Sequence, residues 1–96
     1  MEFLLIAYDG TDGAALDRRM SVREEHLAYA RKLRQNGKMI KGGAFLSDDG
    51  KMIGSTIIYQ VDSEAEVKEI IANDPYKTNG VWVDITTKHI RLANLD

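Results

Sequence analysis

Apolar and polar residues follow one another along the chain in blocks that predict four strands. Residues 3–8 are apolar at every position, which is typical of a central strand covered on both faces. Residues 38–46 and 51–61 predict two further strands, and the turn-forming residues 47–50 join them as a hairpin. Residues 81–86 alternate between apolar and polar, which is the period of a fourth strand.

The apolar phase of this last strand shifts by one residue beyond Thr87, where Ile90 and Leu92 become the apolar positions. An extra residue in one strand of a pair produces such a shift. We therefore expect a β-bulge near Thr87 or Lys88, or a strand that changes partners there.

A serine cap marks the start of the longer predicted helix. Ser21 is followed three residues later by Glu24, which is the spacing of a capping box, and the helix should run from Val22 to Asn36. Gly37 supplies the left-handed residue that ends it. Residues 14–20 form either a short separate turn or an extension of the same helix.

The same capping signature recurs at residues 62–66. The apolar residues between positions 65 and 71 are spaced for a short amphipathic helix. This helix should end near Asn73, because Asp74 precedes Pro75 and is displaced from helical geometry.

The order βαββαβ predicts a ferredoxin-like α+β fold for residues 1–96, taken as a single domain. Its four-stranded antiparallel sheet should carry two helices on one face. The first strand is apolar on both sides, and Ile57 and Ile58 point to opposite sides of the third. We therefore expect the uncovered face of the sheet to be apolar and to pack in a homodimer.

Composition narrows the functional classes. The 96 residues include no cysteine, which excludes disulfides and thiolate chemistry, and the net charge of −2 argues against a nucleic-acid partner. The longest apolar run is far shorter than the roughly 20 residues that span a membrane, so we expect a soluble, cytoplasmic protein. Residues 18–41 nevertheless carry eight Lys or Arg against two Glu, and this local positive charge could attract a small anion.

His26 is the most informative polar residue. On a helical wheel it lies in the middle of the apolar stripe, and Arg23 lies at the edge of that stripe. Arg19 joins them if the helix begins early enough. Because buried charged groups need partners, we expect carboxylates near these side chains. The candidates are Asp9 and Asp74, and the sequence does not decide which lies closer to His26.

Structural alternatives exist for each of these residues. His26 could be a core-edge histidine satisfied by backbone atoms, and the Arg23 stem could pack on apolar surface with its head in water. His89, the only other histidine, has no nearby carboxylate motif, so no metal site is predicted. Tyr76 and Trp82 are expected in the core or in a pocket wall.

Several short motifs in a fixed order resemble the YciI-like (YCII-related) family. They are Arg-Met-Ser-Val-Arg-Glu-Glu-His-Leu at 19–27, Gly-Lys-Met-Ile at 37–40 before the Gly-Gly at 42–43, Gly54-Ser55, Asp62-Ser63, and Asp-Pro-Tyr at 74–76 before Gly80-Val81. Each motif is weak alone, but their joint order and spacing cover nearly the whole chain.

The resemblance implies a ferredoxin-like domain of the dimeric α+β barrel superfamily, with a site built around a histidine and an aspartate. The matching residues here are His26 and Asp74, which the resemblance makes the catalytic pair. The residues implied in substrate binding are Arg23, Arg19, Asp9, Ser55 and Tyr76. No metal or organic cofactor is expected.

Three functions remain open from the sequence. The leading hypothesis is an enzyme that uses the His26–Asp74 pair for acid–base chemistry, an elimination or an isomerisation, on a small anionic organic substrate. The alternative is a non-catalytic dimeric module that binds a small anion. The third possibility is a purely structural polar network that orients the first long helix over the sheet.

Overall fold

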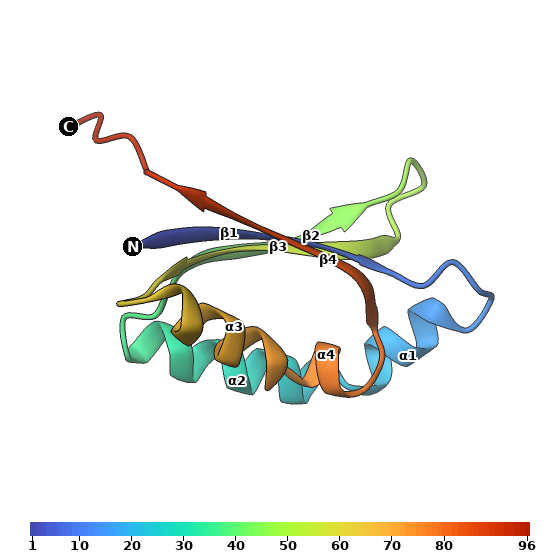
Figure 1. Cartoon of the computed structure of the whole chain (residues 1–96). Coiled ribbons are helices and arrows are strands. Elements are labelled where there is room, and N and C mark those ends of the chain that lie inside the picture. Colours follow the sequence, from blue (N-terminus) through green and yellow to red (C-terminus); the bar gives the residue numbers. More distant parts are fainter.

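A computed structural model describes residues 1–96 as a four-stranded antiparallel sheet with all of its helices on one face (Figure 1). The elements in chain order are β1 (Glu2–Asp9), α1 (Ala15–Ser21), α2 (Arg23–Gln35), β2 (Met39–Leu46), β3 (Met52–Gln60), α3 (Glu64–Ala72), α4 (Pro75–Thr78) and β4 (Trp82–Ile90). The strand order is β2-β3-β1-β4, so β1 and β3 form the centre of the sheet. The ferredoxin-like α+β fold is therefore confirmed.

The central strand β1 separates the two faces of the sheet. Phe3, Leu5 and Ala7 are buried beneath the helices, whereas Leu4 and Ile6 between them are half-buried on the opposite face. This explains the unbroken apolar run, because one set of residues packs into the core and the other lies on the uncovered face.

The core lies between the sheet and the helices. Its eleven buried members are Phe3, Leu5, Ala7, Ile57, Tyr59, Val61, Val67, Ile71, Tyr76, Val81 and Trp82. They come from β1, β3, α3, α4, the start of β4 and the segments flanking these elements. Burial of this apolar surface holds the helix layer on the sheet.

The expected capping box at Ser21 is wrong. Ser21 is the last residue of α1, and its hydroxyl donates a hydrogen bond to the carbonyl oxygen of Arg18 instead of capping α2. A capping residue needs an extended backbone, but Ser21 is already helical because α1 leads into α2 through the single residue Val22. Residues 15–21 thus form a separate helix.

The expected end of α2 and the expected cap of α3 agree with the structure. Gly37 follows α2 with a φ of 73°. The side chain of Ser63 caps α3 by accepting a hydrogen bond from the backbone N–H of Glu66, whose carboxylate accepts one from the N–H of Asp62. These contacts satisfy amide groups that a helix start leaves unpaired.

The irregularity in β4 lies earlier than expected. Thr87 and Lys88 pair regularly with β1, and the register shifts where Tyr8 pairs with Asp84 but Asp9 pairs with Trp82. The extra residue between these partners is Val83, which is 65% exposed. The shift in apolar phase near the C-terminus has another cause. Ile85 lies on the helix-covered face of the sheet, whereas Ile90 lies on the uncovered face.

This bulge determines where Trp82 points. In a regular register Val83 would lie opposite Asp9, and Trp82 would face the uncovered side of the sheet. The extra residue brings Trp82 onto the helix-covered face, where it is 3% exposed.

None of the helices has the length and apolar composition needed to cross a membrane.

Candidate functional site

His26 and Asp74 form a buried hydrogen-bonded pair. His26 lies in the first half of α2, and its Nδ1 is 2.8 Å from Oδ1 of Asp74, a carboxylate whose side chain is 1% exposed. The same Oδ1 accepts a hydrogen bond from the backbone N–H of Tyr76 at 2.9 Å. The carboxylate is therefore held by two donors from different parts of the chain.

The local sequence explains why Asp74 is available at this place. It precedes Pro75 and has an extended backbone, so it becomes the N-cap of the short helix α4. Packing of α4 between α2 and β4 then brings the capping carboxylate against the imidazole of His26. One carboxylate thus caps a helix and satisfies a buried histidine.

Aromatic rings enclose the imidazole. The ring of Tyr76 stacks on His26 with their centroids 3.9 Å apart, and Trp82 approaches the imidazole edge-on at 5.9 Å. The guanidinium of Arg19 lies over the Tyr76 ring at 4.6 Å. Burial raises the pKa of the Tyr76 phenol, and the positive charge of Arg19 opposes this effect in part.

A second buried polar cluster lies beside the first. Nη1 of Arg19 donates to both carboxylate oxygens of Asp9 at 3.0 Å, and Nη2 donates to the hydroxyl of Ser55 at 2.9 Å. The indole Nε1 of Trp82 donates to the same hydroxyl at 3.0 Å. The Arg19 and Asp9 side chains are only 4% and 3% exposed, so they form a paired charge inside the protein.

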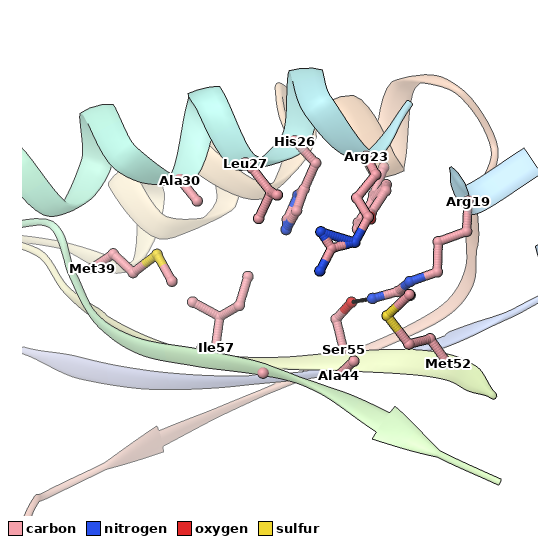
Figure 2. Close-up of a pocket in the computed structure, with 13 residues that line it drawn as sticks. Arg19, Arg23, His26, Leu27, Ala30, Met39, Ala44, Met52, Ser55 and Ile57 are labelled. Atoms are coloured by element: carbon pink, nitrogen blue, oxygen red, sulfur yellow. Dashed lines mark hydrogen bonds between the residues drawn. The ribbon is translucent and has the colours of Figure 1, made fainter. Parts of the chain in front are cut away.

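A cavity of about 200 Å³ opens between α2 and the β2–β3 side of the sheet (Figure 2). Its polar wall contains Arg19, Arg23, His26, Ser55 and Tyr76. Its apolar wall contains Leu27, Ala30, Met39, Ala44, Met52 and Ile57. Gly42 and Gly43 of β2 complete the lining, so a small molecule with one apolar side and one polar side would match its walls.

Arg23 differs from the other arginine of the site because its guanidinium has no ion-pair or hydrogen-bond partner. Figure 2 shows its side chain extending from α2 into the cavity. The carboxylates closest to the site are already engaged, Asp9 by Arg19 and Asp74 by His26. The cavity therefore contains a positive charge that the protein itself does not neutralise.

All seven residues singled out from the sequence come together here. The structure resolves the open question about partners, because Asp74 contacts His26 and Asp9 contacts Arg19. Neither aspartate lines the cavity, and each holds a residue that does. No group of three or more His, Cys, Asp or Glu side chains is placed to hold a metal ion.

Sequence reasoning missed two parts of the site. Trp82 was expected as core or pocket wall, and its hydrogen bond to Ser55 depends on a bulge that was expected elsewhere in β4. The only available signal was that a buried indole N–H needs an acceptor. Met39 and Met52 line the cavity from two neighbouring strands, and nothing in their spacing distinguished them from ordinary core residues.

The fold and the buried polar groups define a ferredoxin-like α+β protein with a histidine–aspartate pair beside a small cavity. Residues 1–91 match the family described as the YCII-related domain. The chain belongs to this family.

The relatives include proteins without an assigned activity. An uncharacterised protein of Haemophilus influenzae is 30% identical over 92% of this chain and 94% of its own length. The protein YciI of Escherichia coli is 29% identical with the same coverage. A protein of Emericella nidulans, named derivative of benzaldehyde biosynthesis cluster protein C, is 33% identical over 68% of this chain and 74% of its own.

One similar solved structure is a named enzyme. It is the 5-chloro-2-hydroxyhydroquinone dehydrochlorinase TftG of Burkholderia phenoliruptrix, solved in complex with 2,5-dihydroxybenzoquinone. Its TM-score with this chain is 0.84, with 30% sequence identity, and the match covers 97% of this chain and 96% of that chain.

Two arginines of α1 form ion pairs, Arg19 with Asp9 and Arg18 with Asp12, and we expect the loss of each pair to affect stability differently. Asp9→Ala should lower the free energy of unfolding by about 3 kcal/mol, because it leaves the Arg19 charge buried without a partner. Urea unfolding followed by circular dichroism measures this change.

Asp12→Ala is the matched control. Asp12 pairs with Arg18 at the surface, at 2.8 Å, where water replaces the lost partner. The urea midpoint of the Asp12→Ala variant should therefore stay close to that of the unmodified protein. Equal effects of the two substitutions would show that the Arg19–Asp9 pair is not the buried charge described above.

Proposed function

We propose that this protein is an enzyme that performs acid–base chemistry on a small anionic organic molecule, with His26 as the proton carrier. The observation that carries the proposal is the arrangement of His26, which is hydrogen-bonded through Nδ1 to the buried Asp74 while its ring lines a cavity containing the unpaired Arg23. The reaction is an elimination or an isomerisation.

Asp74 sets the state of the imidazole in this proposal. A carboxylate can only accept, so the hydrogen bond places the proton of neutral His26 on Nδ1. Nε2, which makes no hydrogen bond within the protein, then carries the lone pair that removes a proton from the substrate. Asp74 also stabilises the imidazolium that this transfer creates.

The reaction then needs a place for negative charge. When Nε2 of His26 removes a proton from a C–H or O–H group of the substrate, the electron pair of the broken bond is delocalised toward a substrate oxygen. In an elimination the leaving group departs with its bonding pair, and in an isomerisation the proton returns at another atom. In this proposal Arg23, which lines the cavity, binds the substrate anion, and its free guanidinium stabilises the developing charge.

The remaining residues shape the cavity. Arg19, whose charge is paired with Asp9, forms part of the polar wall. Tyr76 supports His26 by stacking and presents part of the wall to a ligand.

The resemblance to TftG supports the elimination class. That protein is a dehydrochlorinase, and its structure contains a dihydroxylated quinone. A cavity of about 200 Å³ with one apolar wall suits a single substituted ring. We therefore propose a hydroxylated ring compound as the substrate class.

Replacing His26 with Gln tests the proposal. With chlorinated hydroxyhydroquinones as trial substrates, loss of HCl gives a quinone, so chloride release and the quinone absorbance report turnover. We expect His26→Gln to lower kcat by about 100-fold or more, because a positioned acid–base group contributes rate factors of this size. Retained turnover would contradict the role of His26.

Arg23 provides a second variant that does not depend on the buried pair. Arg23→Gln should raise KM and leave the melting temperature unchanged, since the guanidinium has no protein partner to lose. Arg31→Gln on the exposed side of the same helix is the matched control and should change neither quantity. Ligand binding by the unmodified protein with no turnover of any trial substrate would favour the non-catalytic anion-binding alternative.

We also propose that two copies pack through the uncovered face of the sheet. All helices lie on the other face, as Figure 1 shows, and the uncovered face carries half-buried apolar residues of three strands: Leu4, Ile6, Ile58 and Ile90. Covering these residues would remove apolar surface from water. A structurally similar protein of Jannaschia, at 13% identity and a TM-score of 0.54, is described as a dimeric ferredoxin-like protein.

Ile58→Glu should convert the dimer to a monomer, because it places a charge in the centre of the proposed interface. Light scattering coupled to size-exclusion chromatography measures the mass. Ala28→Glu on the exposed side of α2 is the control and should leave the dimer intact. An unmodified protein that elutes as a monomer would refute the proposed dimer.

The cytoplasmic location expected from the sequence stays a prediction.

A further inference from the structure

The hydroxyl oxygen of Ser55 receives two hydrogen bonds. Nη2 of Arg19 donates to it at 2.9 Å, and Nε1 of Trp82 donates to it at 3.0 Å. A serine hydroxyl has two acceptor lone pairs and one O–H donor. Both acceptor positions of Ser55 are therefore occupied.

The proton of this hydroxyl has no acceptor in the protein. A guanidinium and an indole N–H cannot accept hydrogen bonds, so neither neighbour can receive it. No other polar atom of the chain is hydrogen-bonded to this hydroxyl. Ser55 is 2% exposed overall, and it lines the cavity beside Arg23 and His26. The cavity is thus the open direction for the proton.

We propose that Ser55 donates its hydroxyl proton to an oxygen atom of the bound molecule. Ser55 and Arg23 then form an oxyanion-binding pair, with Ser55 on β3 and Arg23 on α2, next to Nε2 of His26. This assignment rests on the proposed function, and it narrows the ligand to one with a carbonyl, enolate or phenolate oxygen.

The surroundings of Ser55 strengthen it as a donor and disfavour it as a nucleophile. Donation from a cation and from an indole polarises the hydroxyl, because hydrogen bonds in a chain reinforce one another. The same two bonds occupy the lone pairs that a nucleophilic oxygen would need. Such a donor is placed to stabilise charge as it develops on a substrate oxygen.

The β-bulge at Val83 supports this arrangement. It turns Trp82 onto the helix-covered face, and only from there can the indole N–H reach Ser55. Without this bond Ser55 would keep a free lone pair and could accept a hydrogen bond from a ligand. Because of the bulge, the Ser55 hydroxyl can donate a hydrogen bond to a ligand but cannot accept one. A ligand atom that accepts a hydrogen bond is therefore favoured beside Ser55 over one that donates.

Ser55→Ala tests the donor role by calorimetric titration with 2,5-dihydroxybenzoquinone, the compound bound to the similar protein TftG. We expect the dissociation constant to rise about tenfold or more, as for the loss of a hydrogen bond to a charged group. Ser55→Ala also leaves two buried donors unpaired and will lower the melting temperature.

Ser63→Ala separates these two effects. It removes the cap of α3, which costs stability at a site far from the cavity lining. It should leave the dissociation constant unchanged. If Ser55→Ala binds 2,5-dihydroxybenzoquinone as tightly as the unmodified protein does, the donor role is wrong, while the proposed function stands.

A ligand-free crystal structure tests the same inference without any ligand affinity. A water molecule inside the cavity should lie within hydrogen-bond distance of the Ser55 hydroxyl, as its third neighbour. A protein acceptor in that position would overturn the inference. Failure of the unmodified protein to bind 2,5-dihydroxybenzoquinone would count against the proposed substrate class, and this crystallographic result would then decide the role of Ser55.

Discussion

The hydrogen bond between His26 and Asp74 links the fold to the proposed chemistry. An imidazole on the apolar side of a helix loses its contacts with water, so its nitrogens need partners within the protein. Asp74 supplies one at 2.8 Å because the following proline directs the chain into α4 with this carboxylate at its N-cap. The bond therefore ties α2 to α4 and leaves the other imidazole nitrogen for a ligand.

A second set of buried polar groups completes the site by the same rule. Arg19 is neutralised by Asp9, and its Nη2, together with the indole N–H of Trp82, occupies both acceptor positions of the Ser55 hydroxyl. The ring of Tyr76 contacts both sets, stacking on His26 and lying under the guanidinium of Arg19. The Arg23 guanidinium and the Ser55 hydroxyl proton have no partner in the protein, and both belong to residues that line one cavity.

Local patterns predicted much of this structure, and long-range packing set the remainder. Gly37 and the Ser63 cap depend only on neighbouring residues, and the helical wheel placed His26 on the buried side. The cap at Ser21 failed because a preceding helix occupies its position. The choice between two aspartates, and the contact of Trp82 with Ser55, depend on helix packing and strand register, which no local pattern contains.

Long-range ¹H–¹⁵N NMR of the histidine rings near neutral pH tests the central proposal most directly. The account predicts that neutral His26 carries its proton on Nδ1, toward Asp74, and leaves Nε2 bare toward the cavity. His89, which has no carboxylate partner, serves as the internal reference. A His26 ring protonated on Nε2 with a bare Nδ1 would contradict the account, because no lone pair would then face a substrate.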